Sequence, residues 1–71
     1  MKITYDPQTD LLYIRLDERK QQVVNKKLME GVVIDVGEGE RIVGIEILDA
    51  SKRVEIEGLL PVSYEVVAAT K

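Results

Sequence analysis

The sequence contains no cysteine and no histidine among its 71 residues. The chain can therefore form no disulfide and none of the usual zinc sites. A domain of this length buries only about 60% of the surface that its unfolded chain exposes, so its core is marginal. Small domains are usually reinforced by disulfides, by a metal or by association of subunits. Association is the candidate that this composition leaves, and we expect a homo-oligomer, most simply a dimer.

Long apolar runs and an excess of basic charge are also missing. No apolar stretch approaches the roughly 20 residues of a membrane-spanning helix. The chain opens directly into a predicted strand, so we expect no signal peptide. A net charge of −3 argues against nucleic-acid binding. The hydrophobic share of 45% lies well above the disordered range. We expect one soluble, cytoplasmic domain over residues 1–71, with no membrane and no nucleic-acid partner.

The stretch from Gly31 to Ser51 predicts the β-hairpin around which the chain is organised. β-Branched residues alternate with other residues in both of its halves, which is the pattern of strands. Pairing Val36 with Arg41 leaves a four-residue loop, a common hairpin length. Ile34 then faces Val43, and one face of the hairpin becomes almost wholly aliphatic.

A second hairpin is predicted at the start of the chain, from strands over residues 1–6 and 11–16. Asp6 and Pro7 suit the first two positions of a type I turn. Pairing Tyr5 with Leu12 again leaves a four-residue loop. The two hairpins therefore share one design.

Secondary structure is also predicted for three shorter stretches, in which apolar residues alternate less regularly. Residues 22–27 favour a strand that is kinked or bulged before Gly31, although a helix over residues 21–29 stays open as an alternative. Asp49 reads as the N-cap of one or two helical turns. Residues 62–69 favour a C-terminal strand, because a β-branched run follows Pro61 closely.

The predicted fold is mainly β, on the border of α+β. We expect an antiparallel sheet of five or six short strands built from hairpins, with one short helix after Asp49. So small a sheet needs a cover on its apolar face, from a second layer of the chain or from another subunit. The predicted core residues are Ile3, Tyr5, Leu12, Ile14, Leu16, Val32, Ile34, Val36, Val43, Ile45 and Ile47.

Candidate chemistry is sparse. Glu46 interrupts an apolar strand and Asp49 follows at its end, so these two carboxylates are weak candidates for a metal-binding or small-molecule site. The alternative places Glu46 on the polar face and makes Asp49 a helix cap. The turn at Gly37–Gly39 leads into a strand and not into a helix, and the neighbouring glutamates repel anions. Both features disfavour phosphate binding. No histidine base is available for a hydrolase triad. We expect no catalytic residue and no cofactor.

Two segments resemble a known family. The segments are YDPQTDLLYIRL, from Tyr5 to Leu16, and GVVIDVGEGERIVGIEILDASKRV, from Gly31 to Val54. They resemble the DUF2283 family, small prokaryotic proteins of unknown function. The resemblance covers about three-quarters of the chain and implies no catalytic residue. Some members are encoded beside small toxin-like nucleases, so the resemblance implies an antitoxin role as an alternative function. The residues themselves favour a non-enzymatic, self-associating protein that binds another protein.

Overall fold

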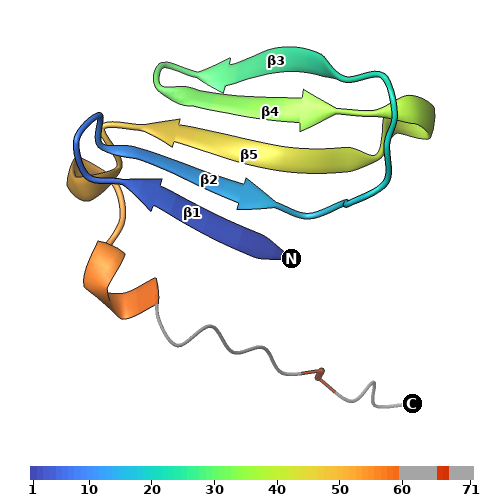
Figure 1. Ribbon diagram of the computed structural model, residues 1–71. Helices are drawn as coiled ribbons and strands as arrows, with labels where there is room; N and C mark the ends of the chain where they lie inside the picture. Colours follow the sequence, from blue (N-terminus) through green and yellow to red (C-terminus); the bar gives the residue numbers. More distant parts are fainter. Residues whose placement is uncertain (60–65, 68–71) are drawn as a thin grey trace.

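The computed structural model describes residues 1–59 and 66–67. Within them the chain forms one five-stranded antiparallel sheet in the order β1-β2-β5-β4-β3 (Figure 1). Short 3-10 turns are the helical elements there, so the mainly β prediction is confirmed. The elements are β1 (Lys2–Asp6), β2 (Leu11–Arg15), β3 (Val24–Met29), β4 (Val32–Val36), η1 (Glu38–Glu40), β5 (Ile42–Leu48), η2 (Ala50–Lys52) and η3 (Ile56–Leu59).

The first hairpin has the predicted register. Tyr5 lies opposite Leu12 in β1 and β2, and Asp6 lies opposite Leu11. The Asp6 carboxylate accepts a hydrogen bond from the Gln8 amide at 2.9 Å. This contact stabilises the turn that the Asp-Pro sequence predicted, because an Asp side chain at the start of a turn bonds the backbone two residues on.

The register predicted for the second hairpin is wrong. Ile34 faces Ile45 and not Val43, a shift of two residues, and nearer the turn Val36 faces Ile42 and not Arg41, a shift of one. The ladder is irregular here because Val43 has no partner opposite it in β4. A shift of two residues preserves the side-chain alternation, so the aliphatic face remains aliphatic.

β2 accounts for the irregularity at Val43. The Val43 carbonyl accepts hydrogen bonds from the amides of Leu16, at 2.7 Å, and Asp17, at 3.1 Å, just after β2. In the turn between β4 and β5, the Gly37 amide donates to the Arg41 carbonyl at 2.7 Å. Gly39 has φ +68°, which confirms the positive φ predicted for it.

β3 is a strand, so the helical alternative for residues 21–29 is wrong. Its ladder with β4 shifts between Lys27 and Met29, which confirms the predicted bulge before Gly31. All six of its residues are exposed. β3 forms one edge of the sheet and β1 forms the other (Figure 1).

The predicted helix after Asp49 is a single 3-10 turn, η2, and its cap comes from elsewhere. Asp49 adopts a left-handed conformation with φ 52°, and its side chain makes no capping hydrogen bond. Asp10 takes that role from the first hairpin: its carboxylate accepts from the Ser51 amide at 3.0 Å and from the Ser51 hydroxyl at 2.7 Å. The Tyr5 hydroxyl donates to the same carboxylate at 2.6 Å.

Burial is shallow in the part of the chain that the structure describes. Leu12, Val43 and Ala50 are the buried hydrophobic residues there. Most of the predicted core is half-buried, and Leu16 is exposed, so its assignment to the core is wrong. Leu16 follows the last paired residue of β2, and no residue of β1 lies opposite it.

The strand expected over residues 62–69 lies outside the described residues, apart from Val66 and Val67. These two residues are largely exposed and belong to no strand. No helix in residues 1–59 or 66–67 is long and apolar enough to cross a membrane.

Candidate functional site

Four polar side chains from four strands meet on the face of the sheet opposite to the aliphatic one. They form the carboxyl cluster, made of Tyr13 in β2, Asn25 in β3, Asp35 in β4 and Glu46 in β5. Tyr13 and Glu46 lie opposite each other across β2 and β5, and Asn25 lies opposite Asp35 across β3 and β4. The order of the strands therefore brings together residues that are far apart in the sequence.

Asp35 is the centre of the carboxyl cluster. It is buried, with 7% of its surface exposed. The Tyr13 hydroxyl donates to Asp35 Oδ2 at 3.2 Å, and the Asn25 amide donates to Asp35 Oδ1. A buried carboxylate needs such partners because an unpaired one would lose its hydration without compensation. The hydrogen bonds connect β2, β4 and β3 across one face of the sheet.

Gly44 makes the contact between Tyr13 and Asp35 possible. It lies in β5 opposite Asp35, between the strands that carry the two partners. A Cβ atom on Gly44 would lie 2.7 Å from Cζ of Tyr13, which is shorter than the van der Waals distances that Cβ atoms keep from other atoms in proteins. The tyrosine ring therefore occupies the space that a side chain at this position would fill. Gly44 is needed here for space, since its φ is not positive.

Titration of the cluster is perturbed by burial and by Asp35. Burial raises the pKa of Glu46 above its ordinary value, and the negative charge of Asp35 and hydrogen bonding to it add to the effect. Burial also raises the pKa of the Tyr13 hydroxyl, again with a contribution from Asp35. Glu46 thus holds its proton more tightly than an exposed glutamate does. Perturbed groups of this kind mark candidate sites, although structural networks produce them too.

The two carboxylates that the sequence analysis paired differ in their surroundings. Glu46 is half-buried in the carboxyl cluster, whereas Asp49 is exposed beyond the end of β5. Residues 1–59 and 66–67 contain no group of three or more acidic side chains that could hold a metal ion. The metal or small-molecule site at Glu46 and Asp49 stays a prediction.

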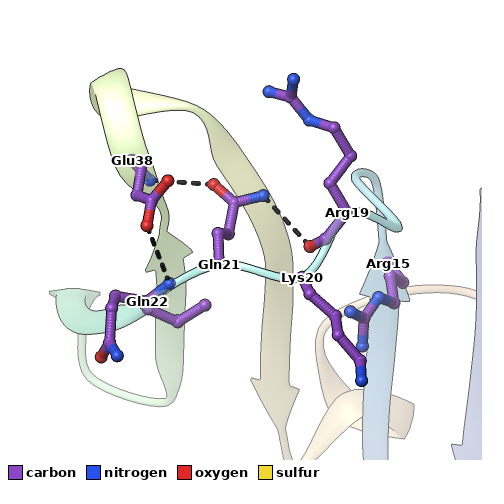
Figure 2. Close-up of a pocket in the computed structure, with 7 residues that line it drawn as sticks. Arg15, Arg19, Lys20, Gln21, Gln22 and Glu38 are labelled. Atoms are coloured by element: carbon purple, nitrogen blue, oxygen red, sulfur yellow. Dashed lines mark hydrogen bonds between the residues drawn. The ribbon is translucent and has the colours of Figure 1, made fainter.

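A second candidate is a groove of about 550 Å³ beside the loop that joins β2 to β3. Figure 2 shows Gln21 between the η1 turn and the loop: its Oε1 accepts from the Glu38 amide at 2.8 Å, and its Nε2 donates to the Arg19 carbonyl at 3.3 Å. The residues that line the groove are Arg15, Arg19, Lys20, Gln21, Gln22, Val23 and Glu38.

Carboxylates next to the groove offset most of its positive charge. Arg15 pairs with Glu18 at 3.4 Å, and Arg19 pairs with Asp17 at 3.6 Å. Asp17 is buried and also binds Arg41. The hydrogen bond from Arg41, with a second from the Arg19 amide, holds the pKa of Asp17 below its ordinary value. The loop is thus fixed by its own ion pairs, which leaves little charge for an anionic ligand.

Sequence reasoning missed Asp35, Asn25 and Tyr13 as members of one cluster. Asp35 carried a usable signal, because it is the one charged residue in an otherwise apolar strand, VVIDV. Tyr13 carried none, since its contact with Asp35 depends on β5 lying between β2 and β4. Asn25 lies opposite Asp35 in the neighbouring strand, so its contact depends on the register of β3 with β4.

Comparison with known proteins identifies the family. The sequence model of the family described as "Protein of unknown function (DUF2283)" matches residues 2–51. No curated protein and no solved structure matches the chain. The matched region runs from β1 into η2 and so contains the whole sheet, the carboxyl cluster and the Asp10–Ser51 contact. With more than half of its length matched, the chain belongs to the DUF2283 family.

Proposed function

We propose that the protein is a non-enzymatic module that associates with itself and binds another protein. The distribution of apolar side chains carries this proposal. In the described residues three hydrophobic residues are buried, whereas ten large ones are exposed. A folded chain must offset its lost conformational entropy mainly by burying apolar surface. Association supplies the burial that one copy of this sheet lacks.

Four of the ten exposed apolar residues lie along one edge of the sheet. Val23, Val24, Leu28 and Met29 lie on β3 or directly before it and form the β3 patch. Their exposed fractions range from 41% at Val23 to 65% at Leu28. Exposed apolar groups at a sheet edge with free backbone donors and acceptors suit the addition of a strand or another apolar segment from a protein partner. The β3 patch is the surface that we assign to that partner.

Self-association is tested by light scattering across a dilution series. A dimer mass at high concentration, with a melting temperature that falls on dilution, is the expected result, because association stabilises the folded state by mass action. A monomer mass at every concentration, with a melt independent of concentration, would contradict self-association.

The protein partner is tested by capture from a native extract on the immobilised protein. We expect a stoichiometric partner that is retained by the unaltered chain and lost with Leu28→Lys. Leu48→Lys is the matched control, because Leu48 is also an exposed leucine but lies at the end of β5. Absence of a stoichiometric partner, or equal loss with both variants, would contradict the assignment of the β3 patch.

A further inference from the structure

We propose that two copies of this chain form an antiparallel pair through their β1 edges, about a two-fold axis that lies between the two copies of Thr4. The inference rests on the proposed self-association and names the surface that carries it. β1 is an edge strand, since its ladder partner in the described residues is β2 alone. Its second edge is therefore available to another strand.

The register of such a pair is restricted by symmetry. Residues opposite each other in an antiparallel pair project their side chains from the same face. A two-fold axis perpendicular to the sheet keeps each side chain on its own face. The axis must therefore lie between one residue and the same residue of the second copy, and not between two successive positions of the strand. β1 runs from Lys2 to Asp6, so full overlap of its five residues places the axis at Thr4.

This register is complementary in charge. Lys2 lies opposite Asp6 of the partner subunit, and the symmetric contact repeats the pair. Thr4 lies opposite its own copy, and threonine pairs across strands are favourable, as are pairs of opposite charge. Lys2 makes no ion pair within residues 1–59 and 66–67, and Asp6 uses one carboxylate oxygen, Oδ1, for its turn. Both charges are thus free to pair between subunits.

The same register also continues the aliphatic face from one subunit to the next. Ile3 and Tyr5 are the half-buried residues of β1, and they alternate with exposed Lys2, Thr4 and Asp6. Pairing about Thr4 sets Ile3 opposite Tyr5 of the partner subunit. Hydrogen bonding to Asp10 at 2.6 Å fixes the Tyr5 ring in each copy. The paired sheet therefore buries two further contacts between isoleucine and tyrosine without a change in either subunit.

The opposite edge of the sheet disfavours self-pairing. A two-fold axis near the middle of β3 must pass through Lys26 or Lys27, because both central residues of Val24–Met29 are lysines. Either choice sets a lysine opposite its own copy, and like charges in that position are destabilising. The bulge between Lys27 and Met29 also interrupts a regular ladder. Both features disfavour the pairing of β3 with its own copy, so β1 is the edge left for a second copy.

Charge reversal tests the pairing. Lys2→Glu sets two pairs of acidic residues face to face across the axis, and Asp6→Lys sets two pairs of lysines face to face. We expect each single variant to raise the dimer dissociation constant about tenfold in sedimentation equilibrium at low salt. The double variant restores opposite charges at both places, so its dissociation constant should return to within about threefold of the unaltered value. Lys26→Glu, an exposed reversal on β3, is the control and should leave it unchanged.

The outcomes separate this inference from the proposed function. A dimer that tolerates Lys2→Glu, or a double variant no better than the singles, would overturn the β1 pairing and leave self-association standing. A changed dissociation constant for Lys26→Glu, with none for Lys2→Glu, would assign the interface to β3, because Lys26 lies on that edge of the sheet. A chain that is monomeric before any substitution would overturn self-association and this inference with it. A circular dichroism melt of each variant checks that Asp6→Lys has not simply lost its turn.

Discussion

Leu12→Ala is the substitution that best tests where the core lies. Leu12 is 1% exposed and is the largest fully buried side chain among the described residues. Truncation of a buried leucine costs about 3 kcal/mol or more, because the lost transfer energy and the residual cavity add. A chain of this size has a total stability of about 4–10 kcal/mol. The substitution should therefore remove between a third and most of the stability.

Urea unfolding followed by circular dichroism at one fixed protein concentration measures the effect. With a slope of about 1 kcal/mol per molar urea, the midpoint should fall by about 3 M. Leu11→Ala is the matched control: Leu11 is half-buried and its side chain is on the opposite face, so its cost should be about 1 kcal/mol. Ile45→Ala should fall between the two, since Ile45 is half-buried but lies between Ile14 and Ile34 on the aliphatic face. A cost for Leu11→Ala equal to that of Leu12→Ala would refute the assignment of the core to this face.

Three further substitutions test the turn and the carboxyl cluster. Gly39→Val should lower the free energy of unfolding by about 1 kcal/mol, because a β-branched residue disfavours the positive φ at this position. Gly39→Asn is the control and should be nearly neutral in the same melt. Open space surrounds the position, so an unchanged stability of Gly39→Val would contradict the turn geometry. Glu46→Gln should raise the melting temperature at pH 7 by no more than about 4 °C and give no gain at pH 4. The sign follows from the raised pKa of Glu46: folding favours its protonated form, so stability falls as the pH rises from near the ordinary value of 4.5 through the folded pKa. An equal gain at both pH values would exclude titration as the cause. Gly44→Ala should destabilise by about 1–2 kcal/mol by displacing the Tyr13 ring from Asp35, and the loss should largely disappear in a Tyr13→Ala background, where no ring occupies the space.

The local chemistry of the sequence was sufficient for the strands and for the first hairpin. Alternation of β-branched residues indicated β4 and β5, and the Asp6-Pro7 turn fixed the pairing of Tyr5 with Leu12. The positive φ of Gly39 also followed from turn chemistry alone. In each case the decisive interaction joins residues within about ten positions of one another, so a short window of sequence contains both partners.

The register of the second hairpin and the carboxyl cluster depended on the tertiary structure. Val43 of β5 has no partner in β4, because its carbonyl accepts hydrogen bonds from two amides that follow β2. Nothing in the hairpin itself specifies that contact. Glu46 was paired in the sequence analysis with Asp49, a neighbour along the chain, whereas the sheet places it with Asp35, a neighbour across strands. That placement follows from the observed register of β4 and β5, in which Glu46 lies opposite Val33, two residues from Asp35. The contact of Tyr13 with Asp35 required β5 to lie between β2 and β4. Strand order is decided by burial summed over the whole sheet, and no single stretch of the sequence contains that sum.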